Sequence, residues 1–310
     1  TIGGVQVKSI GVSAFQDTTT ATSIVIPAGV TSIGDKAFAK CSSATSIAIP
    51  EGVTTIGIRA FQNCSAMTTV TIPSTVTQIQ DWAFYLCAKL STAYFEGDAP
   101  SYFGSAVFDG TARNFNIFFK STNSGFSEPT WNGYQCYPRY LVIFVAGSHG
   151  VVNGTTSQIV NRGSSSTPVT AETSSSGYKF IGWTGDYAGT ANPLTLVNVV
   201  KDMVVTANFD IDRSIDTNVT AIDVPEEGTA VFKVRLCGPP EDQVVVTVAR
   251  TSGDTDITVS SGSTLTFTSE NWNVYQDVTL AAAKDADAVN GSAVITCSAP
   301  GLVSTTVSAT

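Results

Sequence analysis

Hydrophobic positions in the first third of the chain recur with a period of 23 residues. The period is marked by four phenylalanines, and these are Phe15, Phe38, Phe61 and Phe84. Each copy also holds a short alternating segment such as "SIAIP", in which Ile47 and Ile49 share one face of a strand and Ser46 lies on the other. A fixed period of about 20 to 29 residues with such strands predicts a solenoid in which each copy supplies one rung.

The alternation also predicts which side chains of the repeats are buried. Ile47 and Ile49 should stack between their counterparts in the neighbouring copies, and the phenylalanines should form a second buried column on the return side. The outward positions are the candidate binding surface, and they are Ser46, Ala48, Thr69, Thr71, Thr92 and Tyr94. Small polar side chains suit hydrogen bonds to a sugar or a protein, and they are equally typical of an inert β surface, so both interpretations stay open.

The amino-acid sequences of the individual copies are also distinctive. "GVTSIGDKAFAKCSSATSIAIP" at 29–50 is followed by "GVTTIGIRAFQNCSAMTTVTIP" at 52–73, and both resemble the BspA-like leucine-rich repeats of bacterial surface proteins. The resemblance covers about residues 4–97. After "YFEGDAP" the 23-residue frame breaks, and the aromatic-rich segment that follows is expected to cap the array, because a last rung without a cap would expose its apolar face. The first predicted domain is therefore residues 1–138.

Three cysteines, Cys41, Cys64 and Cys87, recur in the same frame. A metal site is one interpretation, but the sequence offers neither a CxxC spacing nor a nearby histidine. We therefore expect buried, reduced thiols that fill the core as small hydrophobic groups.

The next segment, residues 139–210, has no 23-residue frame. Strand-like runs such as "YLVIFVA", "KFIGW" and "MVVTANF" alternate with Gly and Ser turns, which predicts a separate small β domain. "GYKFIGWTGD" and "NVVKDMVVTANF" resemble the divergent internalin B-repeat, also called the Listeria-Bacteroides repeat, and this implies a β-grasp-like, non-catalytic domain. His149, the single histidine, is expected in a turn, and Trp183 is expected to anchor the core, with a sugar-stacking platform as the alternative.

Residues 211–310 show strands of six to eight residues separated by turn clusters such as "CGPPED", which predicts a β-sandwich. "VPEEGTAVFKVRL" resembles the immunoglobulin-like sandwiches of the Calx-beta type. That resemblance implies a possible calcium site on loop carboxylates, with a solvated acidic edge as the alternative. The candidate ligands are Glu226, Glu227, Asp254, Asp256, Asp285 and Asp287. Whether Cys237 and Cys297 form a bridge between the two sheets stays open, because Cys237 shares a strand face with charged residues.

Composition and charge exclude several classes of function. The abundance of Ser, Thr and Gly fits a mainly β, multidomain protein. The net charge of −9 leaves no basic stripe that could bind nucleic acid. No run of about eighteen apolar residues is present to span a membrane. The first residues do not read as a signal peptide, so any signal or anchor is expected outside this chain. No nucleophile, base and orienting carboxylate are placed to converge, so no catalytic residue is assigned and no cofactor other than calcium is expected.

Together these features predict a non-catalytic extracellular module of a bacterial cell-surface or secreted protein. The repeat face would serve adhesion or ligand binding, and the two later domains would act as spacers. The expected partner is a protein or a glycan at the cell surface, and the chain is expected to be a monomer. The alternative function is the accessory region of a larger secreted enzyme that degrades polysaccharides.

Overall fold

The computed structural model describes residues 6–284 and 291–310. Every regular element in these residues is a strand, which confirms the mainly β fold class. The contacts divide the chain into two units. The first unit comprises residues up to Ile143 together with Thr155–Pro168 and Leu194–Val204, and the second comprises Phe144–Gly154, Val169–Pro193 and Val205–Thr310.

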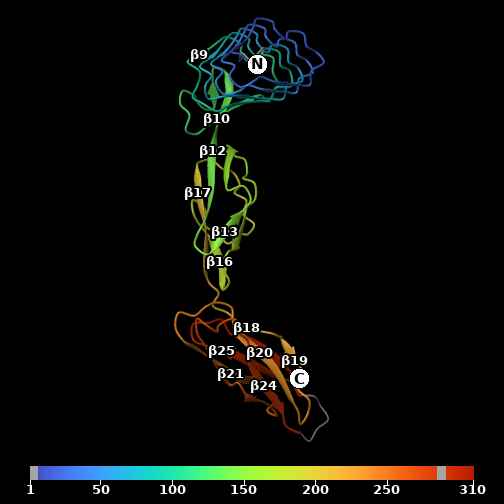
Figure 1. Cartoon of the computed structure of the whole chain (residues 1–310), viewed down its shortest axis with the longest axis vertical. Coiled ribbons are helices and arrows are strands. Elements are labelled where there is room, and N and C mark those ends of the chain that lie inside the picture. The colour runs from blue at the N-terminus through green and yellow to red at the C-terminus, as the bar shows by residue number, and fades with distance from the viewer. Residues whose placement is uncertain (1–5, 285–290) are drawn as a thin grey trace. The chain divides into compact units, whose positions relative to one another are not determined.

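The first unit contains a solenoid whose rungs contribute strands to two parallel arrays, and the stacked rungs are visible in Figure 1. One sheet consists of two-residue strands, paired in the order β1 (Ser9–Ile10), β3 (Ser32–Ile33), β5 (Thr55–Ile56), β7 (Gln78–Ile79) and β9 (Tyr102–Phe103). The other side of the rungs carries β2 (Ser23–Val25), β4 (Ser46–Ala48), β6 (Thr69–Ile72), β8 (Thr92–Phe95), β10 (Asn116–Lys120) and β12 (Tyr134–Ala146). There β2 pairs with β4, and β6, β8, β10 and β12 pair in that order.

The phenylalanine column is the centre of the solenoid core. Phe38, Phe61 and Phe84 are at most 2% exposed. Their rings and that of Phe15 stack almost parallel, with centroids 5.3, 5.4 and 5.0 Å apart along the column. This distance is close to the spacing of about 4.8 Å between paired strands, so each ring lies directly over the one in the rung before it. The predicted buried ladder is therefore confirmed.

The solenoid continues beyond the end of the 23-residue frame. Phe108 stacks on Phe84 at 5.2 Å, although it follows it by 24 residues. Gly97 still lies against Ser74, 23 residues earlier, whereas the hydroxyl of Ser101 donates to a carbonyl 24 residues earlier. One extra residue between Gly97 and Ser101 thus shifts the frame while the rung persists. The expectation that the regular array ends near residue 97 is wrong, because β10 and β12 extend it.

The cap that was expected directly after residue 97 lies further along the chain. Trp131, on the short strand β11 (Thr130–Trp131), is 8% exposed and packs against Phe103 with centroids 4.5 Å apart and against Phe126 at 4.9 Å. Tyr134 packs edge-on against Phe108 at 5.6 Å. These aromatic side chains cover the core of the final rungs, as a solenoid end requires.

Strand β12 runs through the domain boundary that was expected between residues 138 and 139. Before this point it pairs in parallel with β10, placing Cys136 opposite Ile117. After it, β12 pairs antiparallel with β14 (Ser157–Asn161), and Arg139 lies opposite Asn161. The last strand of the repeats therefore passes directly into the following segment.

The three repeat cysteines form a buried thiol column. Cys41, Cys64 and Cys87 are 0% exposed, and their Sγ atoms donate to the carbonyls of phenylalanines in the preceding rungs at 3.3, 3.3 and 3.2 Å. Burial raises the pKa of the Cys41 thiol to about 11. The adjacent Cys87 thiol and burial together raise the pKa of Cys64 far above its ordinary value.

We expect these three thiols to resist alkylation by iodoacetamide in native buffer at pH 8, because all three side chains are 0% exposed and out of reach of the reagent. Cys237, which is only partly buried, is the internal control and should react first. Mass spectrometry of the alkylated peptides would measure this, and all six cysteines should react in denaturant. Rapid native labelling of the thiol column would contradict its placement.

The second unit begins with short antiparallel pairs. They are β13 (Gly150–Asn153) with β15 (Thr170–Thr173), and β16 (Tyr178–Gly185) with the part of β17 (Met203–Ile211) that follows residue 204. Trp183 is 2% exposed and packs edge-on against Phe144 and Phe180, which confirms it as a core anchor. His149 lies in a turn with its ring stacked on Tyr178 at 3.7 Å.

Residues 214–284 and 291–310 form two sheets that enclose one apolar core, as the predicted β-sandwich requires. The first sheet has the order β18 (Ile215–Thr217), β20 (Thr229–Leu236), β24 (Gln276–Ala282) and β22 (Ile257–Ser261). The second has the order β19 (Ala221–Ile222), β26 (Thr305–Ala309), β25 (Ala293–Ser298), β21 (Val244–Gly253) and β23 (Thr264–Phe267). The resemblance to Calx-beta domains stays a prediction. Cys237 and Cys297 are both free thiols.

Candidate functional site

The predicted binding positions lie on the outward side of the longer repeat strands, which we call the repeat-strand face. Of these side chains, Ser46, Ala48, Thr69 and Thr71 are exposed, and Thr92 and Tyr94 are half-buried. The register sets Thr69 beside Thr92 and Thr71 beside Tyr94. The inward neighbours Ile47 and Val70 are at most 5% exposed, so the alternation along each strand is as predicted.

The character of this face changes toward its C-terminal end, where small polar side chains give way to aromatic ones. Tyr94, Phe118 and Tyr137 occupy equivalent positions on β8, β10 and β12. The rings of Tyr94 and Phe118 stack with centroids 5.8 Å apart, and Tyr137 follows at 6.3 Å in a tilted arrangement. We call these three residues the aromatic stripe.

Of the aromatic stripe, only Tyr94 was predicted from the sequence. Phe118 follows Tyr94 by 24 residues, and Tyr137 follows Phe118 by 19, so neither lies in the 23-residue frame. The alternation within "NIFFK" and "YQCYP" was the available signal, because it sets an aromatic ring between buried positions in each segment.

A charged triad, formed by Glu96, Lys120 and Arg139, adjoins the aromatic stripe. Lys120 Nζ lies 2.9 Å from one carboxylate oxygen of Glu96, and Arg139 Nη2 lies 2.7 Å from the other. The Arg139 side chain is only 10% exposed, and its guanidinium carbon lies 4.9 Å from the centre of the Tyr94 ring. The triad therefore ties the last three repeat strands together beside the stripe.

The charge state of the triad follows from these contacts. Burial alone would raise the pKa of Glu96, but the hydrogen bonds from Lys120 and Arg139 outweigh it and hold the pKa below its ordinary value. Glu96 is thus a carboxylate at neutral pH, and two cations against one anion leave the triad with a net charge of +1.

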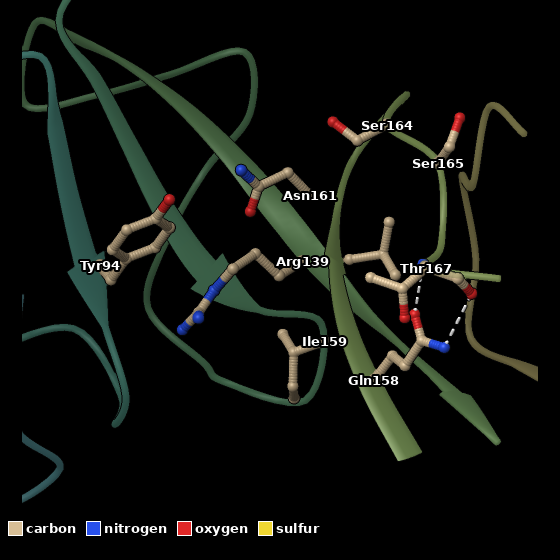
Figure 2. A pocket seen from close by; sticks show the side chains of 9 residues that line it. Tyr94, Arg139, Gln158, Ile159, Asn161, Ser164, Ser165 and Thr167 are labelled. Atoms are coloured by element: carbon tan, nitrogen blue, oxygen red, sulfur yellow. Dashed lines mark hydrogen bonds between the residues drawn. The ribbon is translucent and has the colours of Figure 1, made fainter. Parts of the chain in front are cut away.

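A groove of about 340 Å³ opens beside the triad and lies entirely within the first unit (Figure 2). Figure 2 shows Tyr94 and Arg139 on one side and Ser164 and Ser165 on a facing loop, with Asn161 between them. Arg139 is the sole charged residue among those that line the groove in the described chain. The groove therefore combines one cation with hydroxyl and amide groups.

The facing loop is held by hydrogen bonds at both of its edges. Gln158 is 7% exposed, and its amide accepts from the backbone N–H of Thr167 at 2.7 Å and donates to the Thr167 carbonyl at 3.1 Å. Further along, the backbone N–H groups of Gly163 and Ser166 donate to carbonyls of 194–204 at 2.8 Å. A loop pinned in this way presents its hydroxyls in a fixed arrangement.

The acidic residues proposed for calcium lie elsewhere. Glu226, Glu227, Asp254 and Asp256 lie in the sandwich, where Asp254 accepts a hydrogen bond from the backbone N–H of Asp256 at 2.8 Å. Asp285 and Asp287 fall outside the described residues. Within residues 6–284 and 291–310, no three His, Cys, Asp or Glu side chains come together as a metal site. Calcium binding at this edge stays a prediction.

Comparison with known families agrees with this architecture. Residues 8–134 match the BspA type leucine rich repeat region in six copies, and residues 140–213 match the divergent InlB B-repeat domain. The first match extends through β10, where the 23-residue frame no longer holds. No curated protein matches the chain. No helix in the described part of the chain is long and apolar enough to cross a membrane.

Three solved structures share similarity with part of the chain. A leucine rich cell surface protein from Faecalibacterium prausnitzii is 24% identical, with a TM-score of 0.34, and the match covers 41% of this chain and 32% of that protein. A leucine rich repeat protein from T. pallidum is 22% identical, with a TM-score of 0.32 and coverage of 37% and 64%. A leucine-rich repeat protein from Bacteroides ovatus is 24% identical, with a TM-score of 0.29 and coverage of 45% and 42%. The chain spans less than two thirds of each.

Proposed function

We propose that this chain, a BspA-type leucine-rich repeat region followed by a divergent InlB B-repeat domain, is a non-catalytic extracellular binding module of a bacterial surface or secreted protein. Leucine-rich repeat proteins typically bind proteins, and both matched families are of the type found in bacterial surface proteins. The module holds its partner at the C-terminal end of the repeat-strand face, while the later domains space this face from the rest of the protein.

The aromatic stripe is the observation that carries this proposal. Tyr94, Phe118 and Tyr137 are half-buried, so each ring keeps an exposed edge on an otherwise small and polar face. Aromatic side chains give a large contact area at little cost in side-chain entropy, and binding energy at protein interfaces concentrates on such residues. The Ser and Thr end of the face offers only short side chains, which typically contribute little when truncated.

The chemistry beside the stripe supports binding more than catalysis. Glu96 is the one carboxylate of the triad, and its two cationic partners, Lys120 and Arg139, lower its basicity. His149 belongs to the second unit and stacks on Tyr178 in a turn. A general base needs a pKa near the working pH, and the two cations hold the pKa of Glu96 below its ordinary value instead.

A binding array tests the proposal. The full chain is screened against purified extracellular proteins and glycans, and each hit is titrated with wild type and with the double variant Phe118→Ser/Tyr137→Ser. We expect the double variant to lose about tenfold or more in affinity, as typical for interface aromatic residues. Tyr137→Ala, which leaves the contact between Tyr94 and Phe118 intact, keeps the test valid if the double variant is unstable.

The matched control is Val25→Ser. Val25 is 79% exposed and lies at the other end of the repeat-strand face, so its variant removes an outward apolar group without touching the stripe. Binding should be unchanged in this control. Equal loss in both variants, or no loss in the stripe variants, would contradict the proposal.

One observation favours the alternative function as the accessory region of a secreted polysaccharide-degrading enzyme. The groove presents Asn161, Ser164 and Ser165, whose amide and hydroxyl groups suit a saccharide. If the array returns only glycans, this alternative gains support. If proteins bind and their binding requires the aromatic stripe, the adhesive role gains support.

A further inference from the structure

We propose that the groove beside the charged triad binds the carboxylate of an acidic sugar residue, with Arg139 as the group that recognises it. The inference rests on the proposed binding function and names the chemistry of one ligand group at the same end of the repeat-strand face. It is carried by the state of the Arg139 side chain and by the groups that share the groove with it.

Arg139 is nine-tenths buried, yet part of its hydrogen-bonding capacity is unused. Its Nη2 atom donates to Glu96 at 2.7 Å and to the Phe95 carbonyl at 3.3 Å. Its Nε atom is buried, and among the described residues it has no hydrogen-bond partner. Buried polar groups are nearly always paired, so the guanidinium of Arg139 is incompletely satisfied by the described chain, and Arg139 is also a residue that lines the groove.

The local charge selects the kind of acceptor. The triad carries a net charge of +1, and no acidic side chain lines the groove in the described chain. A monoanionic carboxylate matches this charge, and its planar shape fits the planar guanidinium fork. A dianionic phosphate would keep one uncompensated negative charge, because Arg139 is the sole cation that lines the groove in the described chain.

The remaining wall of the groove favours a sugar over a peptide carboxylate. Asn161, Ser164 and Ser165 both donate and accept hydrogen bonds, as sugar hydroxyls do. Ile159 and the edge of the Tyr94 ring supply apolar surface for the C–H groups of a pyranose. A peptide carboxylate could also engage Arg139, but a peptide offers separate N–H donors and C=O acceptors in place of hydroxyl groups that do both.

Size and rigidity fit the same ligand. The volume of about 340 Å³ is near the lower end of the range of roughly 300 to 1,000 Å³ for ligand pockets, which suits one or two sugar rings. The loop that carries Ser164 and Ser165 is pinned by Gln158 and by bonds to 194–204, so little ordering is needed when a ligand binds.

The test is a calorimetric titration of the full chain with digalacturonate and with galactobiose, which has the same length and lacks the carboxylates. A short acidic peptide is the third probe. We expect digalacturonate to bind at least about tenfold more tightly than galactobiose, because a charge-assisted bond to Arg139 is lost in the neutral sugar. No binding of digalacturonate, equal binding of galactobiose, or tighter binding of the peptide would overturn the proposal.

Variants assign the binding to the groove. Arg139→Lys keeps the charge and removes the fork, and we expect a loss of about tenfold. Asn161 lines the groove and does not contact Glu96, so the variant Asn161→Ala remains informative if the Arg139 variant is unstable. We expect Asn161→Ala to weaken binding about threefold. Arg162→Gln removes a neighbouring arginine that pairs with Glu128 and does not line the groove, and it should bind as wild type does. Equal loss in Arg162→Gln would place the site elsewhere.

These results separate the two proposals. If digalacturonate fails to bind while the Phe118→Ser/Tyr137→Ser variant still loses its partner from the array, the sugar site is wrong and the binding module stands. If digalacturonate binds and depends on Arg139 while the stripe variants keep full binding of every array partner, the groove stands and the stripe is not the binding surface.

Discussion

Replacing Phe61 by alanine should lower the free energy of unfolding by about 3 to 5 kcal/mol. The ring is 0% exposed and is stacked between Phe38 and Phe84 at 5.4 and 5.0 Å. Its removal leaves a cavity bounded above and below by rungs whose backbones are hydrogen-bonded to each other. Phe61 N–H itself donates to the Ala83 carbonyl at 2.8 Å, so the rung cannot collapse into the space without breaking such bonds.

Urea titration measures this loss, and Phe15→Ala is its matched control. Phe15 belongs to the same column but is 47% exposed, and among the described rings it stacks only on Phe38. Its truncation should cost only about 1 kcal/mol, because nearly half of the surface of Phe15 is already in water. A loss below about 1 kcal/mol for Phe61→Ala would contradict the ladder.

The second large effect is expected at the charged triad. Glu96→Gln removes the anion and leaves Arg139 and Lys120 close together with no opposite charge between them. Breaking a buried ion pair typically costs about 3 to 5 kcal/mol. Because the Glu96 side chain retains 25% exposure, we expect about 2 to 3 kcal/mol. Glu51→Gln is the control, since Glu51 lies on an exposed turn and, among the described residues, its carboxylate bonds only to Ser74.

This effect should depend on pH in a defined direction. The pKa of Glu96 is lower in the folded than in the unfolded state, so the unfolded state binds the proton more readily. The contribution of the triad is complete above the ordinary glutamate pKa of about 4.3 and is lost as the pH falls through the lower folded pKa. Unfolding curves of wild type and Glu96→Gln should therefore differ fully at neutral pH and converge in acid. A difference independent of pH would show that the carboxylate charge is not what stabilises the triad.

The regular rungs were predictable because each copy repeats both a period and an alternation. Ile47 and Phe61 could be assigned to the core from the sequence, since the side-chain pattern of a strand has a period of two and the copies fix the frame. The last two strands were not, because one residue inserted before Ser101 and a 19-residue step from Ile117 to Cys136 break that frame. Phe118 and Tyr137 were missed for this reason alone.

The groove could not be predicted from the sequence, for a different reason. It depends on the antiparallel pairing of β12 with β14, which sets Arg139 opposite Asn161, and no local pattern specifies which residues of two distant strands will pair. The loop that faces Arg139 owes its position to the Gln158 side chain and to bonds with 194–204. A glutamine in a strand gives no sign of that role.

Hydroxyl-radical footprinting shows directly whether the C-terminal end of the repeat-strand face contacts the partner. The full chain is oxidised alone and with an extracellular protein captured from the array, and the rate is measured at each aromatic side chain by mass spectrometry. We expect Phe118 and Tyr137 to be oxidised more slowly in the complex, while the oxidation of Tyr85 on the return side and Tyr187 in the second unit is unchanged. Unchanged oxidation of Phe118 and Tyr137, with protection confined to residues away from this face, would contradict it.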